Sequence, residues 1–297
     1  MIKVGLVDFD TSHVVQFTRR MNHLDIEEAQ WVYGAQVVAG CPGESRHSPE
    51  RIPEYTQQLK NYGIKIVDRP EDLLGKIDAV CLEANEGGVH LDRARMFIEA
   101  GLPCFIDKPF EVDIQRAREI VRLAEKKKVP ILSASSLRFA PEVRQAAQDA
   151  SIGKLLGANA YSPASEHPVN PGLFNYGIHG VETLYAFMKE GCQKVSCAYT
   201  SGAEVVTGIW KEDRIGVYRG IRHGASGYGF TLWGEKAIKQ GLVGLDFIYH
   251  ELVKEIVQMF ETGVAPIDPR VTLEIVAFIL AAIKSRQNAG TWVNIQV

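Results

Sequence analysis

The sequence lacks the long apolar segments that span membranes and the basic tracts that bind nucleic acid. No apolar run reaches the ~18 residues that a membrane-spanning helix needs, and the longest, residues 275–283, is expected to form a buried helix. There is no basic tract, and a net charge of −3 offers nucleic acid or an anionic lipid surface no attraction. The chain opens on a strand-like segment, Met1–Val7, rather than on a signal peptide. We therefore expect neither nucleic acid nor a membrane as a partner.

Cysteine is scarce as well, with five residues, an odd number without paired spacing. This pattern excludes a disulfide scaffold and predicts reduced thiols in a cytoplasmic protein. Several of the cysteines sit in apolar runs, where a buried structural thiol is expected. The five are Cys41, Cys81, Cys104, Cys192 and Cys197.

The sequence does have the length and apolar content of two ordinary domains. Its 297 residues, 46% hydrophobic and 23% charged, exceed the size at which one core usually divides. The first half alternates apolar strands with helices of ~10–15 residues, which predicts a parallel, doubly wound sheet. Strands are predicted at residues 2–7, 31–39, 64–67, 79–82, 102–106 and 130–134, and helices at 12–22, 53–62, 70–74, 89–100 and 114–127.

The second half changes character near residue 133. Strands with alternating polar and apolar residues follow one another, which predicts a large, mostly antiparallel sheet with one covered face. Its open face, with Trp210, Val217 and Tyr218 as candidates, is expected to pair with a second subunit. The predicted fold is thus α/β for residues 1–133 and α+β for residues 134–297. The strands are predicted at residues 155–162, 194–200, 204–211, 215–221, 227–234 and 291–297, and the helices at 142–150, within 173–189, at 247–262 and from 268 onward.

The stretch Cys104–Pro109 is the part of the first domain with the clearest chemical meaning. Its apolar residues predict a buried strand, and the proline after Lys108 holds that lysine extended at the end of the strand. Ligands of open parallel sheets bind beyond the carboxyl ends of the strands. Lys108 is therefore a candidate for cofactor contact or proton transfer, with a surface Asp-Lys pair as the alternative.

Five short motifs give the chain a resemblance to a known family. They are Val4-Gly5, Asp107-Lys108-Pro109, Leu137–Pro141, Ile152–Lys154 and Asn175–His179. In this order and spacing the sequence resembles the glucose–fructose oxidoreductase / inositol dehydrogenase / MocA (Gfo/Idh/MocA) family of nicotinamide-dependent oxidoreductases over almost its whole length. The resemblance implies a Rossmann-type dinucleotide-binding domain in residues 1–133. It also implies a domain for substrate binding and oligomerisation, as a homodimer or homotetramer, in residues 134–297.

The resemblance also implies catalytic roles. The family's Glu-Lys-Pro lysine matches Lys108, and its acid/base histidine matches His179, while the family's aspartate is here Asn175. Histidine has a suitable pKa to accept the proton of an alcohol while hydride leaves the same carbon. Residues i and i+4 share a helix face, so Asn175 and His179 are expected to point into one site. The substrate is expected to meet Arg138, Tyr161, Glu166, His167 and Asn170.

The nucleotide-binding loop departs from the family. The glycine-rich Gly-x-Gly-x-x-Gly turn is replaced by Asp8–His13, and Cys41 stands where an acidic ribose-binding residue is expected. A side chain at Asp10 would obstruct a diphosphate and two carboxylates would repel it, whereas a helix N-terminus attracts it. NAD or NADP remains the implied cofactor. The candidate cofactor-binding residues are Asp8, Asp10, Thr11, Ser12, His13, Cys41, Asn85, Glu86, His90 and Asp107.

Acidic residues at several predicted strand ends, with His13 and His90 nearby, leave three interpretations open. They are solvated caps, a polar pocket for a cationic or hydroxyl-rich ligand, or ligands of a divalent metal, although their spacing matches no established metal motif. Three hypotheses for function follow. The first is an NAD(P)-dependent oxidoreductase acting on a sugar, polyol or related small molecule, and we rank it first because Lys108 and His179 persist. The others are a cofactor-free ligand-binding or regulatory protein and a metal-assisted enzyme. The acidic residues are Asp8, Asp10, Glu83 and Asp107.

Overall fold

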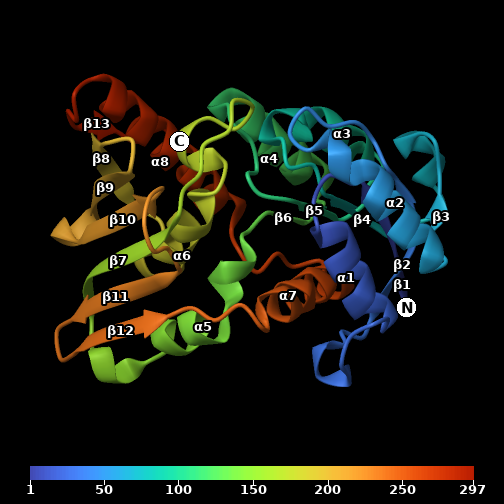
Figure 1. The fold of residues 1–297 in the computed structure, drawn as a ribbon, viewed down its shortest axis with the longest axis horizontal. Coiled ribbons are helices and arrows are strands. Elements are labelled where there is room, and N and C mark those ends of the chain that lie inside the picture. The colour runs from blue at the N-terminus through green and yellow to red at the C-terminus, as the bar shows by residue number, and fades with distance from the viewer. The chain divides into compact units, whose positions relative to one another are not determined.

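The structure is a computed structural model that describes all 297 residues, and these form two compact units. Unit 1 consists of Met1–Ala134 and Tyr249–Pro269, and unit 2 of Ser135–Ile248 and Arg270–Val297. Each unit contains one β-sheet (Figure 1). The predicted fold class is confirmed, because the first sheet is parallel and the second is mixed and mostly antiparallel.

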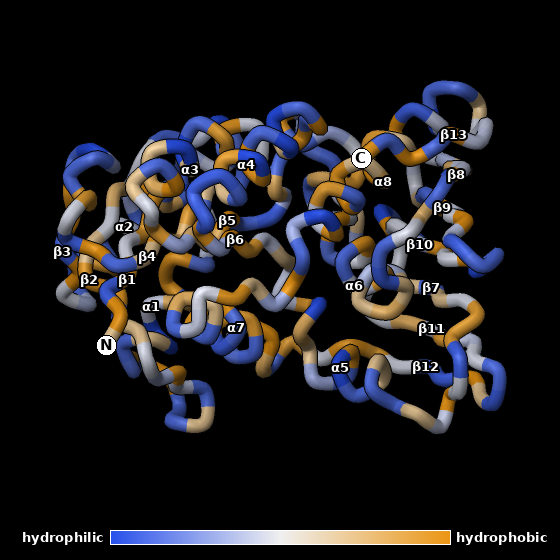
Figure 2. The backbone as a smooth tube through the Cα atoms, turned by 180° about the vertical axis from the view of Figure 1, so that it is seen from behind, coloured by the Kyte–Doolittle hydropathy of each residue, from blue (hydrophilic) through white to orange (hydrophobic).

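The six strands of unit 1 run in the order β3-β2-β1-β4-β5-β6. The strand order reverses between β1 and β4, which is the point where open α/β sheets bind ligands. β4 and β5 contain only buried apolar residues, and they are hydrophobic stretches of the backbone in Figure 2. The strands are β1 (Ile2–Val7), β2 (Ala35–Cys41), β3 (Lys65–Ile66), β4 (Ala79–Leu82), β5 (Cys104–Ile106) and β6 (Ile131–Leu132).

Helices connect these strands, as the alternating pattern predicts. Asp113 caps α4 because its carboxylate accepts hydrogen bonds from the backbone N–H groups of Gln115 and Arg116. α1 buries Val14, Phe17 and Met21 on one face. The α-helices are α1 (His13–Asn22), α2 (Ile52–Asn61), α3 (His90–Glu99) and α4 (Ile114–Lys127), and the 3₁₀ turns are η1 (Glu28–Gln30), η2 (Pro49–Arg51), η3 (Pro70–Leu73) and η4 (Gly87–Val89).

Unit 1 is completed by α7 (Ile248–Thr262), which lies far along the chain. The ring of Tyr249 lies edge-on to His13, with centroids 5.3 Å apart, and the guanidinium of Arg20 lies 5.4 Å from the same ring. Gly34 has a positive φ of 107°, and a Cβ there would lie 2.9 Å from Val257, so this residue has to be small. Nothing in the local pattern of α7 indicates this destination.

The sheet of unit 2 has seven strands in the order β12-β11-β7-β10-β9-β8-β13. Only β7 and β10 pair in parallel. The prediction omitted β12, which alternates exposed and half-exposed residues and contains Lys239, Gln240 and Gly241, so it lacks an apolar face. The strands are β7 (Leu155–Pro163), β8 (Cys192–Tyr199), β9 (Ala203–Trp210), β10 (Ile215–Ile221), β11 (Gly229–Gly234), β12 (Ile238–Leu242) and β13 (Val293–Asn294).

One face of this sheet is covered by α6 (Ile178–Met188) and α8 (Pro269–Gln287). Tyr218 lies against Gly180 of α6, and Trp210 packs on Tyr185 and Phe278 at 5.5 and 6.0 Å between ring centroids. Trp210 and Tyr218 were therefore wrong as candidates for an open face. None of the helices combines the length and hydropathy that crossing a lipid bilayer requires. The remaining elements are η5 (Ser136–Phe139), α5 (Pro141–Ala147), η6 (Ala150–Ile152), η7 (Gly172–Phe174) and η8 (Lys211–Asp213).

Candidate functional site

The carboxyl ends of β1, β4 and β5 bring acidic residues together in unit 1. Each of these strands is followed at once by a buried carboxylate, namely Asp8, Glu83 and Asp107. The backbone ladder continues through them: Glu83 N–H donates to the Val7 carbonyl and Asp107 N–H to the Leu82 carbonyl, both at 2.8 Å. The convergence expected from the sequence is therefore a consequence of parallel strands that end at one edge.

His13, the first residue of α1, lies among these carboxylates. Its Nδ1 is 3.1 Å from Asp107 Oδ2 and 3.6 Å from Glu83 Oε2. Burial would lower the pKa of His13, but the charge of Asp107 and the contacts of the ring with Asp107 and Glu83 raise it to about 10. Burial raises the pKa of Glu83. Burial also opposes charge on Asp107, yet His13 and Lys108 outweigh this and lower its pKa.

Lys108 is held at the end of β5 by its neighbours. Its side chain is 11% exposed, and its Nζ lies 3.6 Å from Asp107 Oδ2. The other oxygen of Asp107 accepts the Lys108 backbone N–H at 2.7 Å. The ring nitrogens of buried His90 lie 3.0 Å from the carbonyls of Pro109 and Ala84, so this imidazole ties the segment after β5 to the segment after β4. His90 thus contacts backbone rather than the acidic cluster.

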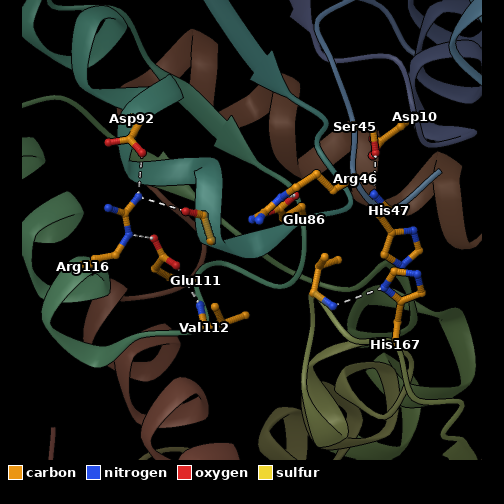
Figure 3. A network of polar contacts seen from close by, with 12 residues as sticks. Asp10, Ser45, Arg46, His47, Glu86, Asp92, Glu111, Val112, Arg116 and His167 are labelled. Carbon is orange, nitrogen blue, oxygen red and sulfur yellow. Dashed lines mark hydrogen bonds and ion pairs between the residues drawn. The ribbon is translucent and has the colours of Figure 1, made fainter. Parts of the chain in front are cut away.

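The carboxylates of the β1–α1 loop turn toward their own partners. Asp8, with a left-handed φ of 65°, lies 3.1 Å from Arg93 Nε, and burial raises its pKa to about 6 although Arg93 opposes this. Asp10 accepts a hydrogen bond from Ser45 Oγ at 2.5 Å, as Figure 3 shows. It accepts another from Asn85 N–H at 2.9 Å, and burial raises its pKa. Arg93 therefore offsets part of the repulsion expected from Asp8, and two neutral donors hold the carboxylate of Asp10.

The other predicted loop residues make local contacts. Thr11 Oγ1 accepts the His13 N–H at 3.4 Å, and the Ser12 carbonyl accepts from two backbone N–H groups of α1. Glu86 accepts a hydrogen bond from Arg46 Nε at 3.0 Å, as Figure 3 shows. The segment after β2 thus reaches the ends of β1 and β4 through Ser45 and Arg46.

A pocket of about 410 Å³ lies at the carboxyl ends of β2 and β3. Cys41, the last residue of β2, contributes to it, and so does the guanidinium-bearing Arg93 of α3. A cavity at this edge of a parallel sheet is suited to the nucleoside half of a dinucleotide, and Arg93 in its wall is paired with Asp8. The residues present therefore fit a nicotinamide dinucleotide here, although the adjacent loop has no glycine. The pocket is lined by Cys41, Pro42, Gly43, Glu44, Ile66, Val67, Asp68, Pro70 and Arg93.

In unit 2, the candidate acid/base histidine sits in the first turn of α6. His179 Nδ1 lies 2.6 Å from Ser135 Oγ, which fixes the orientation of the ring. Asn175 precedes the helix, which begins at Ile178, and its Nδ2 donates to the Ser165 carbonyl at 3.0 Å. The argument that Asn175 and His179 share one helix face was therefore wrong, because no helix connects them.

The predicted substrate residues of unit 2 lie in different places. Arg138 Nη1 is 2.8 Å from Glu182 Oε2 of α6, and both side chains are buried. Glu166 pairs with Arg222 and Arg286, and together with His167 and Arg286 it lines a pocket of about 450 Å³.

Tyr161 faces away from α6. Its neighbour Ser162 lies against Gly180 of that helix, and alternate residues of a strand point to opposite faces. The structure therefore does not bring Tyr161 to His179. His167 remains in its loop, where its Nδ1 accepts the Val169 N–H at 3.4 Å and its backbone pairs with Asn170.

Three residues in these environments were not predicted from the sequence. Ser135 orients His179, Glu182 neutralises Arg138, and Arg93 lines the pocket at the ends of β2 and β3. A signal existed for Glu182, which lies three residues after His179 and so near it on the same helix. Ser135 and Arg93 carry no local signal, because each meets its partner across the fold.

Comparison with known proteins gives three findings. The family GFO_IDH_MocA, described as "Oxidoreductase family, NAD-binding Rossmann fold", matches residues 45–135. The rhizopine catabolism protein MocA of Rhizobium meliloti is 31% identical over 99 residues, which are 33% of this chain and 31% of that protein. The match thus spans about a third of the length of that relative, and the remaining two thirds are not matched.

Solved structures extend the likeness of fold to the whole chain. The scyllo-inositol dehydrogenase of Lactobacillus casei, with bound NAD(H) and scyllo-inositol, has a TM-score of 0.80 at 16% identity and covers 99% of both chains. The myo-inositol dehydrogenase of the same organism, in complex with NAD(H) and myo-inositol, has a TM-score of 0.81 at 17% identity, covering 100% of this chain and 97% of that one. Residues 45–135 thus match the Gfo/Idh/MocA oxidoreductase family, and the whole chain shares the fold of these two dehydrogenases.

Proposed function

We propose that the protein is an NAD(P)-dependent oxidoreductase that transfers hydride between a nicotinamide and the CH–OH carbon of a sugar, polyol or related small molecule. The family description names NAD binding, and two proteins of similar fold were solved with NAD(H) and an inositol. These names describe those proteins. We infer the substrate class of this chain from the analogy of fold.

The observation that carries the proposal is the amine at the end of β5. Lys108 is nearly buried, and its ammonium group has one carboxylate, Asp107, within 3.6 Å. Burying a long, charged side chain at a strand end is costly, and a structural role would favour a closer ion pair. An ammonium group kept in this place is suited to donate hydrogen bonds to a substrate hydroxyl.

Residues of unit 2 are proposed to accept the proton of the substrate hydroxyl. His179, whose ring is oriented by Ser135 at Nδ1, takes the proton of the substrate hydroxyl. Asn175, a neutral amide, orients a second hydroxyl without taking a proton. The bound nicotinamide supplies hydride acceptance.

The nucleotide itself is assigned to unit 1. Its nucleoside half occupies the pocket at the ends of β2 and β3, beside Cys41 and Arg93. The N-terminus of α1, with Thr11 and Ser12, faces the diphosphate, because free N–H groups and the helix dipole favour an anion.

Titration of the purified protein with NADH and with NADPH tests this function. Binding to the pocket is expected to enhance the fluorescence of the reduced nicotinamide, and the preferred nucleotide then serves in turnover assays with inositols and sugars. Absence of enhancement with either nucleotide, up to millimolar concentration, would defeat the proposal.

One observation favours a second candidate, a ligand-binding protein that uses no nucleotide. The loop of residues 8–12 is closed by contacts within unit 1, because Asp10 bonds to Asn85 and Ser45 and Asp8 pairs with Arg93. The same titration separates the two functions, since this second one predicts polyol binding without any nucleotide response.

We further propose that a second copy of the chain covers the open face of the sheet in unit 2. Val205, Ile209 and Val217 alternate there with residues buried under α6 and α8, and all three are half-exposed. Apolar faces of this kind commonly mark subunit contacts. A reducing, cytoplasmic location is part of the same proposal, because all five cysteines are free and buried.

A further inference from the structure

Two buried glutamates of unit 1 differ in how their carboxylates are satisfied. Glu111 accepts hydrogen bonds from Arg116 Nε at 2.8 Å and from Val112 N–H at 2.9 Å (Figure 3). Glu83 is equally buried, yet neither of its oxygens has a hydrogen-bond donor. Buried polar atoms without a partner are rare, and each one calls for a physical explanation.

The unsatisfied atoms around Glu83 form a group. Asp107 Oδ2 and His13 Nδ1 also lack a hydrogen bond, and all these atoms are buried. One ligand atom from each of the three residues lies within 4.8 Å of the other two. Three side chains from different elements thus bring buried ligand atoms to one place.

The spacing of these atoms matches the coordination shell of a small cation. Metal–ligand bonds of about 2.1 Å place neighbouring ligands about 3.0 Å apart in an octahedron and about 3.4 Å apart in a tetrahedron. His13 Nδ1 is 3.1 Å from Asp107 Oδ2 and 3.6 Å from Glu83 Oε2. The two distances therefore suit atoms that share a metal ion, and the shorter one also suits a shared proton.

The three groups are also held in place before any ion arrives. Glu83 and Asp107 follow adjacent strands in register, and the second oxygen of Asp107 is fixed by the Lys108 N–H. The ring of His13 stacks on Phe17 with centroids 5.0 Å apart. Such outer contacts orient ligands and strengthen metal binding.

We propose that His13, Glu83 and Asp107 bind one divalent transition-metal ion, of the Zn²⁺ or Mn²⁺ type, at the carboxyl ends of β1, β4 and β5. One imidazole and two carboxylates suit these ions better than Ca²⁺ or Mg²⁺, which prefer oxygen ligands alone. The ion ties α1 to the two strand ends. None of the three residues lines the pocket at the ends of β2 and β3, and the proposal does not rest on the proposed function.

The competing state is a protonated His13 held between the two carboxylates. Lys108 is the other charged group facing the cluster, with Nζ 3.6 Å from Asp107 Oδ2. Two positive side chains would balance two carboxylates without a metal. Metal content and spectroscopy distinguish these two states.

The test begins with metal analysis of the full-length protein, stripped with a chelator and then exposed to Zn²⁺ or Mn²⁺ in turn. The expected result is about one ion per chain and an unfolding midpoint that rises with added metal. Co²⁺ loaded in place of Zn²⁺ should give visible d–d absorption without the thiolate charge-transfer band that a cysteine ligand would add. Uptake of none of these ions at micromolar concentrations would overturn the proposal.

Variants then locate the site. Glu83→Gln and Asp107→Asn are expected to lower metal affinity at least tenfold and to abolish the metal-dependent rise in midpoint. Glu111→Gln is the matched control, because it removes an equally buried carboxylate that already has its donors. Unchanged uptake in Glu83→Gln, or equal loss in Glu111→Gln, would show that the ion binds elsewhere and would overturn the assignment.

Discussion

The two sheets of this chain gather polar side chains in different ways. In unit 1 every strand is parallel, so the residues that follow β1, β4 and β5 meet at one edge although they lie far apart in sequence. In unit 2 most neighbouring strands are antiparallel, and the residues around His179 come from α6 and the segment that begins at Ser135. In the parallel sheet the topology itself brings polar side chains together at the strand ends. In the mixed sheet the strands support a helix, and the helix carries the polar side chains.

The sharpest test of this contrast is Lys108→Ala, at the edge of the parallel sheet. Loss of the ammonium group is expected to reduce turnover by about 10³-fold, in the range of a positioned acid or electrostatic group. Some stability should also be lost, because Lys108 is one of the two cationic side chains that face the buried Asp107 carboxylate. Steady-state kinetics and thermal unfolding measure the two effects, and normal turnover would remove Lys108 from the mechanism.

The second test concerns the helix of unit 2. His179→Asn is expected to reduce turnover by about 10²-fold, since proton transfer contributes that much in many enzymes. Ser135→Ala should cost about tenfold and also shift the pH–rate profile, because the serine acts by orienting the ring. If the serine variant left both turnover and the pH profile unchanged, Ser135 would be a structural residue only.

The third test returns to the nucleotide pocket. Arg93→Ala is expected to weaken nucleotide binding about tenfold, the effect of losing one hydrogen bond to a charged group. Arg46→Ala serves as the control, because its exposed guanidinium pairs with Glu86 and does not line the pocket. Equal losses in the two variants, measured by fluorescence titration, would mean that the pocket does not hold the nucleotide.

The smallest effect is expected on the open face of the second sheet. Val217→Lys should change the free energy of unfolding by about 0.5 kcal/mol or less, as surface substitutions do. Its consequence is a shift from dimer or tetramer toward monomer in size-exclusion chromatography. A wild-type protein that already elutes as a monomer would contradict the proposed subunit contact.

Much of the fold was predictable because each element's pattern is local. The parallel sheet follows from apolar runs such as Ala79–Leu82, and the cap of α4 follows from Asp113. β12 was missed because its residues have no apolar face, and Trp210 was misplaced because a one-residue error in register reverses the faces of a strand.

The site was predictable only where topology decides it. Parallel strands that end together placed Glu83 and Asp107 side by side, and the first residue of the following helix added His13. The pairing of Asn175 with His179 failed because the helix begins at Ile178, after a 3₁₀ turn. Contacts between residues far apart in sequence, such as that of Tyr249 with His13, cannot be predicted from local sequence patterns.

The late position of α7 has a consequence for how the chain is made. During translation, the six parallel strands of unit 1 leave the ribosome well before α7, and all strands of unit 2 except β13 emerge in between. Until then the surface that receives Leu252, Ile256 and Val257 stays uncovered. A fragment ending at Ala134 should therefore aggregate or need a chaperone, and the amino-terminal unit can mature only after most of its neighbour has been synthesised.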